Sequence, residues 1–224
     1  MFPLKWVIVG LVVAGVLLIG GPYFFFNVVE GKPPSRLQLP AVKGAAATGP
    51  IAGTWTVSSG SQAGYRVHEI LLGQSHTAVG RTSKVTGGMV ISGTEVEAAD
   101  FSVDVGSIRS DQASRDYQFD HYIMEAYNYP HATFKLTEPI QLGGVPAVGQ
   151  TIRRTATGDL TMRGVTRLVT FPVSAERLSN AIDVNAEIPL RFGLWHIPNP
   201  SFAVAQVGNT GTVEVLLHLV RSAG

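Results

Sequence analysis

The stretch that decides the fold is Thr157-Gly-Asp-Leu-Thr-Met-Arg-Gly-Val-Thr-Arg-Leu-Val-Thr-Phe171. It reads as two β-strands folded about its central Arg-Gly turn, with Met162 opposite Val165 and Leu160 opposite Arg167. Because side chains alternate along a strand, the apolar residues gather on one face and the polar residues on the other. The apolar face carries one guanidinium group, that of Arg167. If this face looks into a closed barrel, the hairpin predicts a container for a long apolar molecule with a polar or anionic end.

The sequence from Gly53 onward extends the same β pattern. Short runs show alternation or enrichment in β-branched residues, and most of them are separated by Gly, Pro, Asn or Ser. Many short strands in succession with almost no helix between them favour an antiparallel sandwich or barrel over alternating β-α units. We therefore expect an all-β domain.

One short helix is expected at about residues 110–126. Ser110 is a plausible N-cap, and Pro130 ends any continuation. One face of this helix would cover a side of the barrel, because apolar residues recur at helical spacing: Phe119, Tyr122, Ile123 and Ala126.

Residues 6–26 form a run of 21 residues without a charge. As a helix this run would be about 31 Å long, which matches a bilayer core of roughly 30 Å. A cleaved signal peptide would have a shorter apolar core, of about 7–15 residues, that ends at a small-residue site. We therefore expect residues 1–26 to be an N-terminal membrane anchor, an uncleaved transmembrane helix that crosses the membrane once.

The charges beside this run leave the membrane orientation open. Lys5 lies on one side, whereas Lys32, Arg36 and Lys43 follow on the other, so a positive-inside count would keep the large domain in the cytoplasm. Long domains, however, translocate largely regardless of charge.

Residues 27–52 are rich in Pro, Gly and Ala and predict a semi-extended linker, which leaves residues 53–224 as the folded domain. Four of the 17 Lys and Arg residues and one of the 16 Asp and Glu residues precede Gly53, so the domain carries a net charge of −2. Nucleic-acid binding would require a basic stripe, so we expect no nucleic-acid partner.

The residue types argue against several kinds of site. The chain has no cysteine, which excludes disulfides, thiol catalysis and Cys-ligated zinc. Its six histidines show neither His-x-His nor His-Glu-x-x-His spacing, and no Gly-x-Ser-x-Gly elbow is present. We therefore expect no metal site, and none of these motifs indicates catalytic residues or a cofactor.

Five segments, taken in order, resemble the YceI-like family: Gly53-Thr-Trp-Thr-Val57, Ser107-Ile-Arg109 followed by Arg115-Asp116, Tyr129-Pro130 before Thr133-Phe134, the turn motif from Gly158 to Arg167, and Phe192-Gly193. The resemblance covers about residues 53–221. It implies an extended, lipocalin-like antiparallel β-barrel that holds a polyisoprenoid, such as an isoprenoid quinone or a polyprenyl phosphate, in its lumen. It also implies export, which would place the β domain outside the cytoplasm, at the plasma membrane of the cell envelope.

Two departures from the family pattern keep the head-group preference open. The family usually has an Asp and a His-Ser shortly after the opening Trp-Thr-Val, where this chain has residues 58–64 without histidine. The Arg-Asp pair is commonly followed by His-Leu, and here Tyr117-Gln-Phe119 follows.

The residues expected to line the lumen are the large alternating side chains of the predicted strands together with the buried guanidinium: Trp55, Tyr65, Phe101, Val103, Phe134, Leu160, Met162, Arg167, Val169 and Phe171. Arg115 and Asp116 are expected at the mouth of the barrel or as a brace of the helix. A register slip of one residue would instead turn Arg167 to solvent.

Three functions agree with the sequence. The first is non-catalytic binding of a polyisoprenoid, for storage, shielding or transport beside the membrane. The second is an envelope enzyme that acts on a lipid-like substrate with Asp or His residues at the mouth, and the third is a structural or partner-binding barrel with a filled core. Whether the barrels form a homodimer stays open.

Overall fold

The computed structural model describes residues 32–40, 50–71, 73–201 and 205–222. Within these ranges, no helix is both long and apolar enough to cross a bilayer. The uncharged run of residues 6–26 lies outside them, so the membrane anchor stays a prediction.

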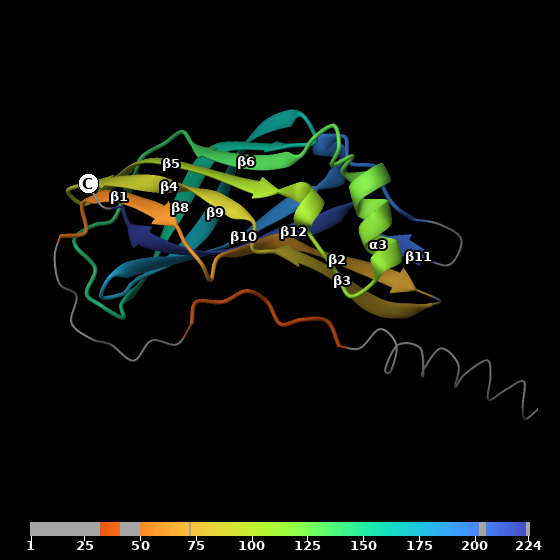
Figure 1. Ribbon diagram of the computed structural model, residues 1–224, viewed down its shortest axis with the longest axis horizontal. Helices are drawn as coiled ribbons and strands as arrows, with labels where there is room; N and C mark the ends of the chain where they lie inside the picture. The colour runs from red at the N-terminus through yellow and green to blue at the C-terminus, as the bar shows by residue number, and fades with distance from the viewer. Residues whose placement is uncertain (1–31, 41–49, 72, 202–204, 223–224) are drawn as a thin grey trace, which may run out of the picture.

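The domain is an antiparallel β-barrel with one short α-helix in the described part of the chain (Figure 1). Its strands are β1 (Gly53–Val57), β2 (Gln62–Leu71), β3 (Gln74–Thr82), β4 (Val85–Ser92), β5 (Glu95–Asp104), β6 (His131–Leu136), β7 (Ile140–Gln141), β8 (Thr151–Met162), β9 (Val165–Arg177), β10 (Ala181–Arg191), β11 (Ala205–Val207) and β12 (Thr210–Arg221). Eight of them form a ring in the order β1-β4-β5-β6-β8-β9-β10-β12, and the pairing of β12 with β1 closes it. The expected all-β barrel is confirmed.

The hairpin of β8 and β9 has the predicted register. Met162 lies opposite Val165, and Leu160 lies opposite Arg167. The turn between them has positive φ at both Arg163 (47°) and Gly164 (73°), which matches the right-handed twist of the strands. A side chain at Gly164 would also collide with the Tyr129 ring, since a Cβ there would lie 2.7 Å from it.

One edge of β12 serves two strands. Residues 212–216 of β12 pair with β2, whereas residues 219–221 pair with β1. The first half of β12 therefore continues into a side sheet of β2 and β3, and the second half closes the ring. The outer edge of β3 is held to the segment after β5 by a backbone bridge between Arg81 and Arg109.

Three short helical elements cover the side of the barrel next to β3: the 3₁₀ turn η3 (Val105–Ser107), the α-helix α3 (Ala113–Gln118) and the π-turn η4 (Phe119–Ile123). They confirm one short helix near residues 110–126. The residue at the N-cap is Gln112 rather than Ser110. Ser110 instead donates from its backbone N–H and its hydroxyl to the Asp116 carboxylate, at 2.8 and 2.7 Å.

The π-turn alters which side chains of this segment face the barrel. Phe119, Ile123 and Ala126 pack against the hydrophobic core as expected, but Tyr122 is 62% exposed. Tyr122 lies within the π-turn, which takes one more residue per turn than an α-helix, so its side chain departs from the 3.6-residue spacing from which it was assigned to the inner face.

Residues 32–40, which were expected to belong to a free linker, lie along the outside of the barrel, across β2, β12 and β10 (Figure 1). Arg66 donates to the Pro34 carbonyl at 2.8 Å, and Asn185 donates to the Leu37 carbonyl at 2.9 Å. The Leu37 side chain is buried. We call residues 32–40 the strap. Its hydrogen bonds and its buried leucine offset the conformational entropy that this short segment loses on ordering.

The strap covers a carboxylate that points away from the lumen. Glu214 on β12 is 1% exposed and accepts hydrogen bonds from Arg66 at 2.5 Å and from Arg81 at 2.9 Å. Arg36 of the strap lies 3.8 Å from the same carboxylate and 2.7 Å from Glu187 of β10. Glu214 therefore ties β2, β3, β12 and the strap together.

Replacing this carboxylate should cost more than replacing its exposed neighbour. Glu214→Gln leaves Arg66 and Arg81 without their buried partner, which should lower the free energy of unfolding by about 3–5 kcal/mol in urea titration. Glu187, which faces Glu214 across β10 and β12, is 41% exposed at its side chain. The control Glu187→Gln should cost at most about 1 kcal/mol. Equal losses from the two variants would contradict the central role of Glu214.

The same pair predicts a loss of stability in acid. Burial raises the pKa of Glu214, but the hydrogen bonds from Arg66 and Arg81 outweigh it and hold the pKa below the ordinary glutamate value of 4.5. A lowered pKa in the folded state stabilises the fold above pH 4.5, and this contribution disappears as the pH falls through the lowered value. Unfolding followed between pH 6 and 2 should show a steeper acid loss for the wild type than for Glu214→Gln. Parallel curves for the two proteins would show that the loss of stability in acid does not come from Glu214.

Candidate functional site

A cavity of about 550 Å³ runs through the barrel. Its wall is made by side chains of the ring strands other than β1, of β2, β3 and β11, and of the segments that join them, and most of these side chains are aliphatic or aromatic. A cavity of this size is inconsistent with a barrel whose interior is packed solid. Seven of the residues predicted for the lumen line it: Tyr65, Phe101, Val103, Phe134, Leu160, Met162 and Phe171.

Two other predicted residues lie in the core rather than on the cavity wall. Trp55 is 5% exposed and donates its indole N–H to the Ile51 carbonyl at 2.9 Å. Val169 is partly buried and packs against the core. Both sit on apolar faces, as the alternation predicts, but neither is among the residues that line the cavity.

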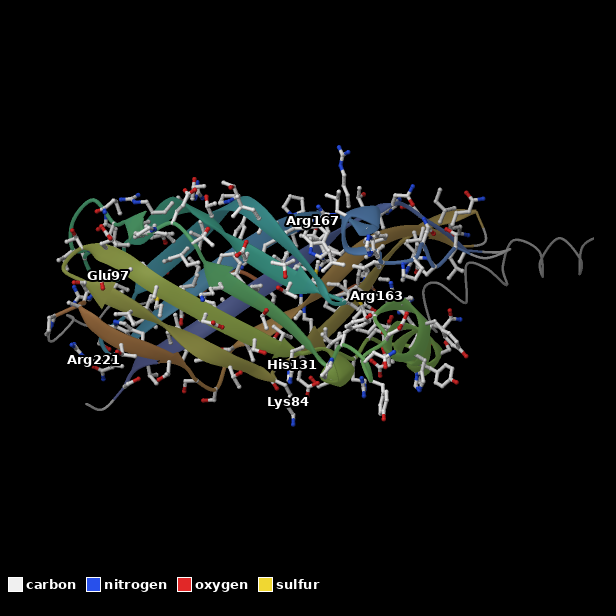
Figure 2. All side chains as sticks on the ribbon, turned by 90° about the horizontal axis from the view of Figure 1, so that it is seen from above. Lys84, Glu97, His131, Arg163, Arg167 and Arg221 are labelled. Atoms are coloured by element: carbon white, nitrogen blue, oxygen red, sulfur yellow. The ribbon has the colours of Figure 1, made fainter. Side chains whose placement is uncertain are left out.

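The placement of Arg167 in the lumen is corrected by the structure. Arg167 is exposed and points away from the barrel (Figure 2), and its Nε donates to the Leu194 carbonyl at 3.1 Å. The register was right, so a slip is not the cause. β10 pairs with β9 only along residues 173–177 of β9, and the turn η5 (Phe192–Trp195) contacts β9 instead. Trp195 of this turn is buried and donates to the Leu160 carbonyl, so an indole rather than the guanidinium packs beside Leu160.

Much of the cavity wall comes from strands that the site prediction left out. β10 and β12 contribute alternating residues: Val184, Ala186, Ile188 and Leu190 on one, and Val213, Val215 and Leu217 on the other. The same period-two rule applied to these strands would have found them. They were missed because the prediction weighted large side chains, and these walls are built from medium-sized ones.

The cavity wall becomes polar at the end where α3 lies, which we call the helix end. Gln112, Ser114, Arg115 and Gln118 of the helical segment line it together with Glu69 of β2. Arg115 pairs with Glu69 at 3.3 Å and with Asp111, and Glu69 also lies 3.0 Å from His76. Arg115 therefore joins the helix to β2 at the mouth, and Asp116 anchors Ser110 at the start of the helix.

Tyr65 lies on the cavity wall between the polar helix end and the apolar lumen. Its ring stacks on Phe119 with the ring centroids 4.9 Å apart. Burial raises the pKa of the Tyr65 hydroxyl above its ordinary range, against the lowering effect of the nearby Arg115. The phenol therefore stays neutral at physiological pH and offers a hydrogen bond rather than a charge.

The opposite end of the cavity carries two guanidinium groups. β8 and β9 run from the turn at residues 163–164 to Arg154 and Arg177, both of which line the cavity. Arg154 donates to the Gln141 carbonyl at 2.8 Å, and Arg177 donates to the Pro146 carbonyl at 3.3 Å. The lumen is thus a long apolar channel with polar groups at both ends.

In the part of the chain that the structure describes, no group of three or more His, Asp or Glu side chains could hold a metal ion. Two carboxylate–histidine pairs are present, Glu69 with His76 and Asp183 with His218. The first lies at the helix end of the cavity, and His218 of the second lies 33% exposed on β12.

Comparison with known families and structures gives the following. The model of the YceI-like domain matches residues 55–219. A polyisoprenoid binding domain from Saccharophagus degradans, implicated in plant cell wall breakdown, is 17% identical; the match covers 76% of this chain and 99% of that chain, with a TM-score of 0.61. Burkholderia cenocepacia BcnA is 19% identical over 74% of this chain and 99% of that chain, with a TM-score of 0.55. A Campylobacter jejuni YceI protein is 12% identical over 64% and 85%, with a TM-score of 0.54. No curated protein matches the chain.

The corrected position of Arg167 predicts a tolerant residue. Arg167→Met should change the free energy of unfolding by no more than about 0.5 kcal/mol and leave the contents of the cavity unchanged, since Arg167 is exposed and donates to the carbonyl of the exposed Leu194. The matched control is Arg163, on the same hairpin, which reaches both the Glu125 carboxylate and the His196 carbonyl. Arg163→Met should lower the melting temperature clearly more than Arg167→Met. The reverse order would show that Arg167 has a structural role.

Proposed function

The chain belongs to the YceI-like domain family, and on that premise we propose that it binds a long-chain polyisoprenoid lipid, such as an isoprenoid quinone or a polyprenyl phosphate, in the lumen of its barrel. The role is storage, shielding or transport of the lipid, without catalysis and without a further cofactor. The observation that carries the proposal is the apolar cavity of about 550 Å³. Its volume lies within the range of about 300–1,000 Å³ that is typical of small-molecule sites.

The apolar wall can supply the binding energy that such a lipid needs. Micromolar affinity corresponds to about −8 kcal/mol, and association itself costs an estimated 4–15 kcal/mol. At about 0.8 kcal/mol for each buried CH₂ group, about 15–30 buried carbons reach that affinity. An isoprenoid tail of about three to six five-carbon units has this many carbons, so the affinity follows from the hydrocarbon alone.

The shape of the cavity favours a linear ligand over a compact one. β9 has 13 residues, which is about 40 Å of strand at 3.3 Å per residue. Lining residues follow β9 and β8 from Met162 near the turn to Arg177 at the other end. The Saccharophagus degradans protein of the same fold is itself a polyisoprenoid binding domain, which supports an isoprenoid over other linear lipids.

The proposal also gives the protein a place in the cell. The uncharged run of residues 6–26 anchors the chain in the plasma membrane, and the barrel lies on the extracytoplasmic side of the envelope. Lipid partners for the barrel are dissolved in that same membrane. A barrel held beside it would take up an isoprenoid without the molecule having to diffuse through water.

The direct test is to extract the purified full-length protein with organic solvent and to identify the lipid by mass spectrometry. We expect a polyisoprenoid at close to one molecule per chain. Protein purified without any co-extracted lipid, and unable to take up added isoprenoid quinone or polyprenyl phosphate, would overturn the proposal.

A matched pair of substitutions tests whether the lumen is the site. Ala156 lines the cavity opposite Phe171, and the adjacent Thr155 is exposed on the outer face of β8. Ala156→Phe should fill part of the lumen and reduce the extracted lipid several-fold, while the β-rich circular dichroism spectrum and cooperative melting persist. Thr155→Phe adds a ring to the same strand outside the barrel and should leave the lipid content unchanged. Equal lipid content in the two variants would place the ligand elsewhere.

A further inference from the structure

Three exposed tyrosines lie close together at the helix end of the barrel. Tyr117 is 54% exposed, Tyr122 is 62% exposed and Tyr127 is 97% exposed. Tyr117 stacks on His121 with the ring centroids 4.2 Å apart, and it meets Tyr122 edge-on at 6.0 Å. Tyr127 and His121 line the same shallow hollow. We call Tyr117, Tyr122 and Tyr127 the tyrosine edge.

The barrel itself does not need these rings. Phe119 and Ile123, from the same segment, already fill the space against the core. Tyr117 and Tyr122 contact each other and His121, and all three tyrosines present surface to solvent. Tyr combines an apolar ring with a polar tip, and such side chains are enriched where a protein meets the interface between lipid and water.

The charges around the tyrosine edge are largely compensated. Asp120 pairs with Arg109 at 3.2 Å, and Glu125 pairs with Arg163. Asp111 pairs with Arg115. These acids therefore present little uncompensated charge to a surface, and attraction to a lipid surface would come from the aromatic rings rather than from anionic head groups.

The strap reaches the barrel beside this edge. The Ser35 carbonyl accepts a hydrogen bond from Arg81, and the backbone of Arg81 bridges to that of Arg109. Arg109 in turn contacts Asp120, the neighbour of His121. The strap also begins on the side of the molecule where α3 lies (Figure 1).

The strap limits how far the barrel can move from a membrane. Ser35 follows Phe26, the last residue of the uncharged run, by nine positions. A fully extended chain spans at most about 3.3–3.6 Å per residue, so Ser35 lies within about 30 Å of the membrane end of the anchor. The segment between the uncharged run and the first contact of the strap is therefore far shorter than the 27–52 linker expected from the sequence.

We propose that the tyrosine edge docks onto the surface of the bilayer when the chain is membrane-anchored, so that the helix end of the cavity faces the lipid. The proposal rests on the anchor given under the proposed function. Gln112, Ser114 and Arg115 line the cavity and belong to the same helical segment, so the tyrosine edge lies next to the polar end of the cavity wall. A lipid that leaves the bilayer at this edge meets the polar helix end of the lumen first.

The absence of cysteine from the chain allows a clean test with single labels. Tyr122→Cys carries a polarity-sensitive nitrobenzoxadiazole label at the tyrosine edge. The matched control is Val145→Cys, because Val145 is 57% exposed and lies next to Pro146 at the opposite end of the cavity. Both full-length variants are reconstituted into phosphatidylcholine vesicles, and each label is exposed to brominated lipid and to aqueous iodide.

The label at position 122 should show blue-shifted emission, strong quenching by brominated lipid and little quenching by iodide. The label at position 145 should show the opposite pattern. High salt should leave the difference unchanged. Adding Tyr117→Ser and Tyr127→Ser to the Tyr122→Cys variant should move its label into water while the protein remains in the vesicle pellet.

Three outcomes would overturn the docking proposal, and they separate it from the proposed function. If both labels respond alike in pelleted vesicles, the edge does not dock although the anchor holds. If the label at 122 stays in lipid after the two serine substitutions, the short segment between the anchor and the strap is enough to position it, and the tyrosines are not needed. If the full-length chain stays in the supernatant, the anchor and the docking both fail. The lipid content of the barrel, measured separately, decides the binding proposal in every case.

Discussion

The structure depends on the way in which β12 divides one edge between two strands. In a closed barrel every strand must find partners on both sides, because an unpaired backbone edge is exposed to water or to other chains. Here the last residues of β12 close the ring through β1, while its earlier residues carry β2 and β3 outward. The second half of β12 therefore completes the ring, and its first half continues into a side sheet beside which the helical segment lies. The cavity and its polar helix end both follow from this division.

Glu214 sits on the part of β12 that carries the side sheet, and its environment explains why the sheet is stable there. Its neighbours Val213 and Val215 face the lumen, so the carboxylate faces outward, where a charge would normally meet solvent. The strap and two arginines enclose it instead. A buried carboxylate with well-placed guanidinium partners is costly to disrupt, even where it contributes little beyond an apolar alternative. The strap is thus part of the folded domain, although it precedes the first strand.

Turn chemistry and strand alternation predicted those parts of the fold that neighbouring residues determine. The Arg163-Gly164 turn set the register of its hairpin, and period-two alternation placed Leu160, Met162 and Phe171 on the cavity wall. The differences arise where distant segments intervene. Arg167 shares the inner row of its strand, but η5 takes that space, and no pattern within the hairpin reports on a turn 25 residues later. Tyr122 lies within a π-turn that the residue pattern does not reveal. The strap is held by arginines and an asparagine that lie 32 to 148 residues after their partners in it.

Because the apolar lumen has polar groups at both ends, it favours a ligand whose apolar tail matches its length. Empty apolar volume in a protein costs about 24 cal/mol for each Å³, so a tail that leaves about 100 Å³ of the channel unfilled forgoes about 2.4 kcal/mol, or roughly fifty-fold in affinity. A tail that is too long must push its excess past Arg154 and Arg177 at the far end, where the wall is charged. Short tails lose affinity because part of the lumen stays empty. Long tails lose affinity because their excess carbons contact the charged arginines. Chain length, rather than head-group chemistry alone, then decides which member of a homologous series of isoprenoids occupies the protein.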